Sequence, residues 1–363
     1  MKTSNPYELR LRALRKAMSR HDLEALYVGA RPNVAYLSGF NGSAGHLLVT
    51  QDSVTLFTDS RYAVQAVEQT SGVEVSVGDR DSLLDLLESL QGRRIRVLGY
   101  ERNRLSLEDF ERLREAPGRR RLAAMEGLVE GLRVVKSEAE IDAVRRSVDL
   151  NSAALERVLA SVRPSWTENR TAGELEYWMR RLGAAGASFP TIVASGAHSA
   201  LPHASPRNEK LGKNRLILID QGADLAGYAS DMTRVASFGD PGPEARKIHA
   251  AVARALEAAV ATVRAGVSTR AVDQAARRSL AAEGLEDLFT HSIGHGVGLE
   301  IHEPPFFRRG SGQSIRLRAG MVITVEPGVY VPGTGGVRIE DILVVRPQGF
   351  ERLTKTSPKL RIL

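Results

Sequence analysis

Five side chains that can bind a metal ion are spread over the C-terminal part of the chain, each in a context that would point it inward. They are Asp220, Asp231, His295, Glu326 and Glu340. Four carboxylates that meet in one core repel one another strongly unless cations neutralise them. A fold that buries all five must therefore bring these segments together around bound metal. One histidine among oxygen ligands suits manganese, zinc, cobalt or iron, and the set implies a dinuclear hydrolytic centre.

Length and composition predict a two-domain cytoplasmic protein. The chain has 363 residues, which is long for one domain, and its 42% hydrophobic content can build a sizeable core. No apolar run approaches the length of a membrane span, and residues 1–10 contain no apolar signal segment. The chain has no cysteine, so neither disulfides nor thiolate ligands are expected. We expect no membrane partner.

The net charge of +7 and the sequence pI of about 9.8 raise the question of nucleic acid. The positive residues are mostly arginines interleaved with Asp and Glu, and the dense cluster is Arg119, Arg120 and Arg121. No known nucleic-acid motif accompanies this cluster, so we expect a solvated surface and no nucleic-acid partner. The positive charge can instead help a peptide carboxylate to approach.

Residues 1–125 predict a small α/β domain, because helix-like and strand-like segments alternate along them. Helices are predicted at residues 9–18 and 81–90, and strands at residues 25–28, 46–50, 53–58 and 94–98. The second and third of these strands form a predicted hairpin. The predicted domains are residues 1–125 and 137–363, joined by a linker at residues 126–136.

Residues 137–363 predict an α+β domain in which helices cover a curved, largely antiparallel sheet. Ser137 with Glu140, and Thr171 with Glu174, have the form of capping boxes. They predict a long helix after residue 137 and a second helix from residue 171 to about residue 185. The remaining predicted helices are residues 243–264 and 269–283, and the predicted strands are residues 188–194, 214–221, 227–238 and several after residue 320.

Strand periodicity allows the five side chains to meet. Side chains alternate between the two faces of a strand, so Arg338 and Glu340 share a face of one long predicted strand. A turn between Asp220 and Asp231 would let them face each other across a hairpin, and Glu326 closes a strand before a Pro-Gly turn. Any one of these residues alone is more often a turn former, a cap or a surface residue. The joint pattern carries the hypothesis.

In their order and flanking sequence, the five residues resemble the pita-bread metallopeptidase family, which includes methionine aminopeptidases, prolidases and aminopeptidase P. The matching stretches are residues 219–223, 227–234, 291–299, 302–304, 324–330 and 336–341. Arg338 stands where methionine aminopeptidases tend to have Gln, and residues 33–40 and 58–62 resemble the creatinase-like N-terminal domain of the proline-specific branch. The resemblance implies a two-domain protein with a creatinase-like α/β domain and a pita-bread domain.

Pro190 departs from the family pattern, because many relatives have Asp at this position. Proline cannot donate a hydrogen bond to a neighbouring strand, so the strand near it should lie at a sheet edge or be locally bulged. The departure concerns the pocket wall near Phe189 and not the metal site.

The resemblance implies a role for each of the five candidates. Asp231 and Glu340 would bridge two divalent metal ions (manganese, zinc or cobalt), while Asp220 binds one ion and His295 with Glu326 binds the other. Water held between the two ions would ionise near neutral pH, and Glu326 would accept its proton.

Four further residues match the family pattern. His203 and His302 would flank the scissile bond as catalytic residues. His291 would lie just outside the metal ligands and bind substrate together with Arg338. The other histidines match nothing and are expected to be ordinary structural or surface residues.

The implied reaction is hydrolysis of the peptide bond that precedes proline. The proline nitrogen in that bond carries no N–H, so peptidases that need this donor fail on it, and an apolar wall that accepts the ring would select it. The wall candidates are Phe189, Ile192, Val193 and Tyr228, although core packing explains them equally well.

The length of the substrate divides an Xaa-Pro dipeptidase (prolidase), which we favour, from aminopeptidase P, which trims longer peptides. A dipeptidase needs a cation for the nearby C-terminal carboxylate, and Arg338, Arg308 and Arg309 are candidates. The rival classes are a metal-free pita-bread binding module, a creatine-cleaving enzyme and, from the pI alone, a nucleic-acid module with steep salt dependence. The first two typically lose some of the five ligands. Relatives are often dimers, so we expect a homodimer.

Overall fold

The computed structural model describes residues 5–79, 81–118, 120–307 and 314–363. Arg119, Arg308 and Arg309 therefore lie outside the described residues. The chain divides into two compact units, Met1–Arg133 and Val134–Leu363, and the division falls within the predicted linker at residues 126–136. Each unit has its own hydrophobic core.

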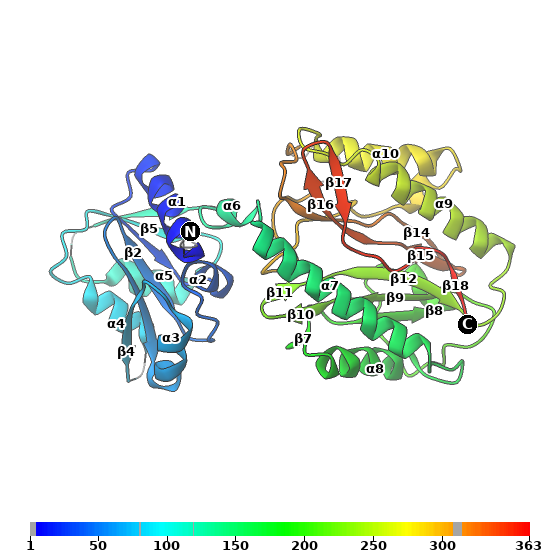
Figure 1. Cartoon of the computed structure of the whole chain (residues 1–363), viewed down its shortest axis with the longest axis horizontal. Helices are drawn as coiled ribbons and strands as arrows, with labels where there is room; N and C mark the ends of the chain where they lie inside the picture. Colours follow the sequence, from blue (N-terminus) through cyan, green and yellow to red (C-terminus); the bar gives the residue numbers. More distant parts are fainter. Residues whose placement is uncertain (1–4, 80, 119, 308–313) are drawn as a thin grey trace. The chain divides into compact units, whose positions relative to one another are not determined.

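The first unit is an α/β domain built on one mixed sheet (Figure 1). Its strands are β1 (Ala25–Val28), β2 (His46–Thr50), β3 (Val54–Asp59), β4 (Glu74–Gly78), β5 (Val97–Glu101) and β6 (Arg121–Met125). Among the described residues these strands form a six-stranded sheet in the order β4-β3-β2-β1-β5-β6. The predicted hairpin β2–β3 is confirmed. β5 begins at Val97, later than predicted, because residues 91–96 form a turn and an irregular segment.

Six helices accompany this sheet within the described residues. They are α1 (Pro6–Arg20), α2 (Arg31–Ser38), α3 (Ala63–Gln69), α4 (Ser82–Ser89), α5 (Leu107–Glu115) and α6 (Glu130–Arg133). The core that α4 shares with the sheet contains Leu83, Leu86, Tyr27 and Phe57, all buried.

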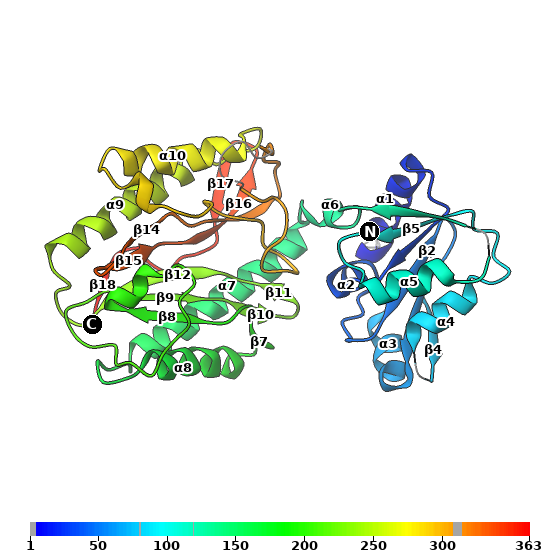
Figure 2. The same ribbon diagram turned by 180° about the vertical axis from the view of Figure 1, so that it is seen from behind.

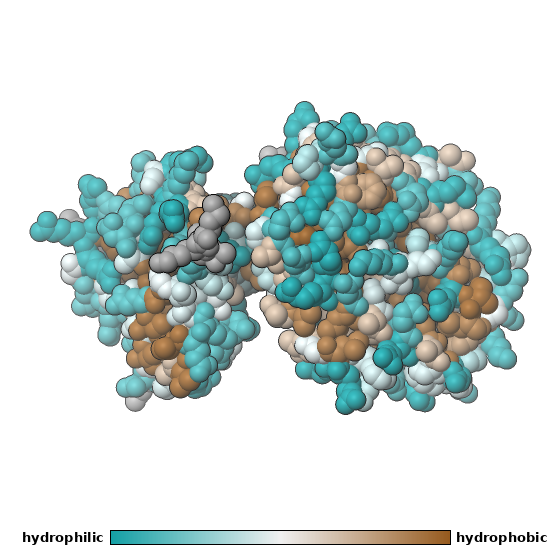
Figure 3. All heavy atoms as spheres, viewed as in Figure 1, coloured by the Kyte–Doolittle hydropathy of each residue, from teal (hydrophilic) through white to brown (hydrophobic). Residues whose placement is uncertain are grey.

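An exposed apolar edge distinguishes one side of the first unit. β4 is an edge strand, and Val77 on β4 is 43% exposed while Val64 and Val67 on α3 are 71% and 67% exposed. Figure 3 shows apolar atoms gathered over this part of the unit. A sheet edge with exposed apolar side chains is a surface on which another chain can pair.

The second unit repeats one arrangement, in which two helices are followed by antiparallel strands. Its helices are α7 (Glu138–Leu159), α8 (Glu168–Arg181), α9 (Pro243–Val260) and α10 (Thr269–Ala281). Buried side chains of α7 and α8 form one core with the strands that precede α9, and those of α9 and α10 form another with the later strands. Figures 1 and 2 show the strands between α8 and the pair α9 and α10.

The strands of the second unit are short and form several small sheets. They are β7 (Gly186–Ala187), β8 (Ile192–Ser195), β9 (Ile217–Gln221), β10 (Ala223–Leu225), β11 (Tyr228–Ala229), β12 (Met232–Ser237), β13 (Val322–Val325), β14 (Gly328–Val331), β15 (Gly335–Arg338), β16 (Asp341–Arg346), β17 (Gly349–Arg352) and β18 (Arg361–Ile362). The sheet orders in the described residues are β11-β10-β7, β18-β12-β9-β8, β13-β16-β17 and β14-β15. Every pairing is antiparallel except β12 with β18, so the predicted largely antiparallel arrangement is confirmed.

Pro190 is exposed and lies just before β8, which is an edge strand as predicted. The strand predicted at residues 188–194 therefore starts only at Ile192. Within the described residues, every helix is too short or too polar to cross a lipid bilayer.

One predicted capping box is confirmed and the other is wrong. The Ser137 hydroxyl accepts a hydrogen bond from the backbone N–H of Glu140, whose carboxylate accepts one from the backbone N–H of Ser137. α8, however, begins at Glu168, and the capping side chain is Thr167. Thr171 lies inside the helix, where its hydroxyl donates to the carbonyl of Thr167. Trp166, just before Thr167, is buried in the same core as α8, and the N–H of Glu168 donates to the carbonyl of Glu209 at 3.0 Å.

Ser137→Ala should lower the free energy of unfolding by about 1 kcal/mol, because the N–H of Glu140 loses its acceptor. Ser137→Asp keeps an acceptor and should retain most of the stability. Ser152→Ala is the matched control, since Ser152 lies in the middle of α7 and should change stability by less than about 0.5 kcal/mol. Equal losses from Ser137→Ala and Ser152→Ala in denaturant unfolding would contradict the cap.

Candidate metal centre

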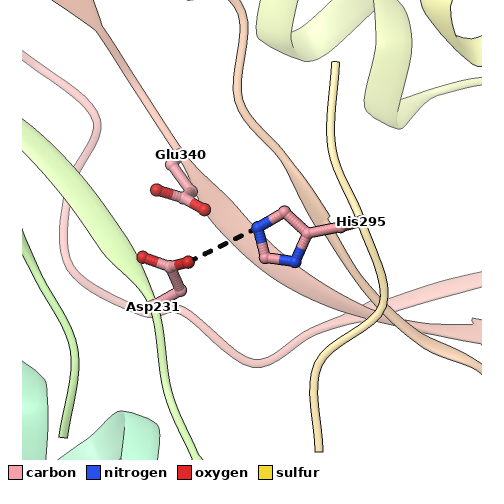
Figure 4. A group of neighbouring side chains, drawn as sticks. All are labelled: Asp231, His295 and Glu340. Carbon is pink, nitrogen blue, oxygen red and sulfur yellow. Dashed lines mark ion pairs between the residues drawn. The ribbon is translucent and has the colours of Figure 1, made fainter. Parts of the chain in front are cut away.

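The structure brings all nine candidate residues to one cavity of about 940 Å³ in the second unit. These residues are Asp220, Asp231, His295, Glu326, Glu340, His203, His291, His302 and Arg338. Figure 4 shows Asp231, His295 and Glu340 pointing toward one another. One ligand atom from each of these three lies within 4.8 Å of the others. The three come from separate segments of the second unit.

Asp220 and Asp231 reach the cavity from the β9–β12 hairpin. Asp220 pairs in register with Thr233, and Asp231 precedes Thr233 by two positions. Residues two positions apart share a face, so the two carboxylates are diagonal neighbours across the ladder. We had expected them to face each other directly. The predicted strand at residues 227–238 is split into β11 and β12, with Asp231 in the gap.

Glu326 and Glu340 lie where the chain crosses from one small sheet to another. β13 ends at Val325 and β14 starts at Gly328, while β15 ends at Arg338 and β16 starts at Asp341. β13 pairs with β16 and β14 pairs with β15, so both glutamates fall between the two ladders. The prediction of one long strand through Arg338 and Glu340 is therefore wrong. At the break, the N–H of Glu340 donates to the carbonyl of Thr233 at 3.2 Å.

His295 is held as a neutral ring. Its Nδ1 lies 3.0 Å from the carbonyl oxygen of Gly296, which can only accept, so Nδ1 carries the hydrogen. Nε2 is left with a lone pair, 3.6 Å from Asp231 Oδ2 and 3.5 Å from Glu326 Oε1. Burial lowers the pKa of His295 to about 4, with a smaller contribution from His302. A neutral imidazole with a free Nε2 is the form that binds metal.

The carboxylates are strained electrostatically. Burial raises the pKa of Asp231 and of Glu340 well above its ordinary value, and neighbouring carboxylates raise both further. Burial also raises the pKa of Glu326 to about 7, against the lowering effect of Arg338. Asp220 Oδ1 and Glu340 Oε1 are buried without a hydrogen-bond partner. Unpaired buried oxygens beside a neutral histidine fit a divalent metal.

Arg338 is buried and all three of its nitrogens are occupied. Nη2 donates to Asp220 Oδ2 at 2.5 Å, Nη1 to the Tyr330 hydroxyl at 2.8 Å and to the Pro202 carbonyl at 3.0 Å, and Nε to the Thr233 hydroxyl at 3.1 Å. A substrate carboxylate would have to share or displace one of these partners. The guanidinium therefore orients Asp220 and offsets part of its charge.

A short chain of hydrogen bonds links Arg338 to His291. The Tyr330 oxygen accepts from Arg338, and its hydroxyl lies 2.8 Å from His291 Nε2. His291 Nδ1 lies 2.8 Å from the carbonyl of Ser292, so Nδ1 donates and Nε2 accepts from Tyr330. Burial, aided by the charge of Arg338, lowers the pKa of His291 to about 4, and burial raises that of Tyr330 to about 12.

The other two histidines lie at the open side of the cavity. The His302 ring stacks edge-on against His295 with ring centroids 4.4 Å apart, and burial lowers its pKa, with a contribution from His203. His203 is exposed on the cavity wall. Both rings are therefore available to a bound molecule.

Sequence reasoning missed Thr233, Thr324 and Tyr330. Thr233 donates to Glu340 Oε2 at 2.8 Å, and the Thr324 hydroxyl accepts from the N–H of His295 at 3.0 Å. Strand alternation could have found the two threonines, because Thr233 is two positions from Asp231 and Thr324 is two positions from Glu326.

Two of the four wall candidates lie elsewhere. Phe189 and Ile192 line the cavity. Val193 points to the opposite face of β8 and packs in the helix-covered core, while Tyr228 packs on another core and donates to Glu140. The placement of Val193 follows from alternation along β8.

Comparison with known proteins agrees with this geometry. The model of metallopeptidase family M24 matches residues 142–347, and that of the creatinase/prolidase N-terminal domain matches residues 10–135. The chain belongs to metallopeptidase family M24. The M24 family implies divalent metal in the cavity that holds the five candidate ligands, and the enzyme is a metallopeptidase.

Relatives of this M24 metallopeptidase cover almost the whole chain. An Xaa-Pro dipeptidase of Pyrococcus horikoshii is 33% identical over 94% of this chain and 96% of its own length. The solved Xaa-Pro dipeptidase from Bacillus anthracis is 34% identical, with a TM-score of 0.94 over 98% of this chain and 100% of its own. The X-Pro aminopeptidase from Thermotoga maritima is 35% identical, with a TM-score of 0.89 over 96% of this chain and 100% of its own.

The metal-free enzyme should lose stability between about pH 7 and about pH 8. Carboxyl groups with a raised folded pKa bind protons more tightly than in the unfolded chain, so stability falls as pH rises through that pKa. The buried histidines are neutral in both states over this range. The free energy of unfolding should fall by up to about 1.4 kcal/mol per pH unit for each carboxyl that is protonated in the folded state and ionised in the unfolded chain.

Thermal unfolding after chelation, with and without added Mn²⁺, measures this effect. Metal should raise Tm more at the higher pH, because it binds the ionised carboxylates and displaces protons. Glu340→Gln should flatten the fall, since it removes a carboxyl whose pKa is raised well above its ordinary value by burial. A Tm that rises with pH in the metal-free protein would contradict the assignment.

Proposed function

We propose that this M24 metallopeptidase hydrolyses the peptide bond before proline and uses two divalent ions, manganese, zinc or cobalt. Asp231 and Glu340 would hold both ions, Asp220 would help to hold one, and His295 with Glu326 would help to hold the other. The observation that carries the proposal is the convergence of four carboxylates and a neutral histidine in one cavity. Two unpaired buried oxygens, on Asp220 and Glu340, support the assignment.

Bound metal supplies Lewis acidity, which lowers the pKa of a bound water toward ~7 and polarises the scissile carbonyl. Glu326 accepts the proton of the attacking water, because its Oε1 lies in the metal cavity 3.5 Å from His295 Nε2. Glu326 then delivers that proton to the proline nitrogen, which leaves as a secondary amine. His203 and His302 orient the scissile bond and donate to the developing oxyanion.

The proline ring has an apolar surface to occupy. Phe189, Ile192, Phe306 and Phe307 line the cavity that contains the five ligands. Similar proteins support the same substrate class, since they include Xaa-Pro dipeptidases and an X-Pro aminopeptidase.

Among Xaa-Pro peptidases we favour the dipeptidase. The B. anthracis dipeptidase has the higher TM-score of the two solved relatives, 0.94 against 0.89. One observation favours the alternative, aminopeptidase P. The guanidinium of Arg338 is occupied by Asp220, Tyr330 and Pro202, so it can meet a dipeptide carboxylate only by exchanging a partner.

We further propose that the enzyme is a homodimer and that it is cytoplasmic. The dimer rests on the family resemblance, and light scattering of the purified protein tests it. The cytoplasmic location rests on the absence of cysteine from the 363 residues.

Glu340→Ala should abolish turnover while the fold persists, because it removes a bridging ligand. Loss of an outer partner of a metal ligand already costs ~10- to 100-fold, so a ligand should cost more. Activity and bound metal are measured together, with EDTA removal and Mn²⁺ or Co²⁺ restoration of the wild type. Glu286→Gln, an exposed residue, is the control. Near-wild-type activity in Glu340→Ala would exclude the ligand assignment.

Comparison of Met-Pro with Met-Pro-Gly separates the two activities. Cleavage confined to Met-Pro is expected for the dipeptidase, because the free carboxylate then lies next to the proline ring. A higher kcat/KM for Met-Pro-Gly would assign aminopeptidase P activity. Met-Ala is the control for the requirement for proline, and equal cleavage of it would contradict the proposal.

A further inference from the structure

Glu168 is a fully buried carboxylate that lies outside the metal cavity. It is the first residue of α8, and its side chain is 0% exposed. Oε1 accepts from the N–H of Ser195 at 2.8 Å, and Oε2 accepts from the N–H of Arg207 at 2.9 Å. His198 Nδ1 lies 2.9 Å from Oε2 and 3.0 Å from Oε1, and it must donate because a carboxylate only accepts.

These three donors span one segment, residues 195–207. The segment connects β8 to the chain that leads to β9, and five of its residues line the metal cavity. These are Pro202, His203, Ala204, Ser205 and Pro206. Glu168 therefore bonds to both ends of the loop that carries His203 and to His198 near its start.

The cavity side of the same loop is attached to the metal-binding strands. The Ser199 hydroxyl accepts from the N–H of Gly336 at 2.8 Å. The carbonyl of Pro202 accepts from Arg338 at 3.0 Å. The loop thus lies between two sets of bonds, one to β15 and the other to Glu168.

His203 depends on this support. Within the described residues its ring has no hydrogen-bond partner, so the loop backbone sets its position. A buried carboxylate is costly unless hydrogen bonds satisfy it, and removing it leaves buried donors unpaired. Loss of the Glu168 carboxylate would therefore free the loop.

We propose that Glu168 is a positioning residue for catalysis, which clamps residues 195–207 and thereby fixes His203 against the scissile bond. The proposal rests on the function proposed for His203. It differs from a purely structural role in one respect: the loss of Glu168 acts through His203 and leaves the metal ligands in place.

A double-mutant cycle of Glu168→Gln with His203→Ala tests the proposal. Glu168→Gln should lower kcat by about 10- to 100-fold, as expected for a misplaced catalytic group, with metal affinity unchanged. In the His203→Ala background the same change should have little further effect, because both variants remove one function. Additive losses, or wild-type kcat in Glu168→Gln, would overturn the proposal.

His198 provides a second route if Glu168→Gln does not fold. His198→Asn keeps a donor near the position of Nδ1 and should restore most of the kcat that His198→Ala loses. Glu209→Gln is the matched control, because Glu209 follows the loop and its side chain is exposed. Equal kcat in His198→Asn and His198→Ala would argue against the clamp.

Amide hydrogen exchange of the metal-loaded protein separates this proposal from the proposed function. Glu168→Gln should speed exchange at residues 195–207 while residues 291–299 keep wild-type exchange. Unchanged exchange in the loop would overturn the clamp even if Xaa-Pro hydrolysis is found. If the wild type does not cleave Xaa-Pro bonds, the cycle is measured on the peptide that it does cleave, and only the proposed function fails.

Discussion

The mutual repulsion of four buried carboxylates is the constraint on which the second unit depends. Burial raises the pKa of Asp231, Glu326 and Glu340, so without cations the fold retains these groups by protonating them. Arg338 offsets one charge through its bond to Asp220. Metal binding and folding are therefore coupled, because the ions stabilise the same ionised groups that destabilise the metal-free chain. The site is a source of instability that the reaction requires.

Side chains outside the cavity support the irregular backbone that carries the cavity histidines. All four histidines of the cavity lie outside helices and strands, and a buried charged side chain bonds close to His203, His291 and His302. Glu168 on α8 binds the His203 loop. Arg277 on α10 donates to the carbonyls of Phe289 and His291. Lys136 pairs at 2.6 Å with Glu303, the neighbour of His302. Two of these three charged side chains lie on helices, and Lys136 lies between α6 and α7.

Local patterns in the sequence predicted most of the fold and the residues of the candidate site. The predictions that were wrong concern features that depend on long-range contacts. The Ser137 capping box and the β2–β3 hairpin involve neighbours in sequence, so both were predicted. The break at Glu340 was missed because it arises from pairing with two different strands, β14 and β13. Thr171 matched a cap as well as Thr167 does, and the start of α8 involves a long-range contact between the N–H of Glu168 and the carbonyl of Glu209. One of the hydrogen bonds that occupy the Arg338 guanidinium comes from the carbonyl of Pro202, 136 positions away.

The carboxylate ligands lie on other segments than the loops that carry His203 and His302. This separation explains how one scaffold can serve substrates of different length. Strand crossings position Glu326 and Glu340 in the cavity. A dipeptidase and an aminopeptidase are similar to this chain at 34% and 35% identity, so sequence identity does not distinguish them. The difference must lie in what meets the carboxyl side of proline. In this chain Arg338 is bonded to Asp220, a metal-ligand candidate, so capture of a substrate carboxylate by Arg338 would also alter the environment of the metal. Substrate length and metal chemistry are then linked through one guanidinium.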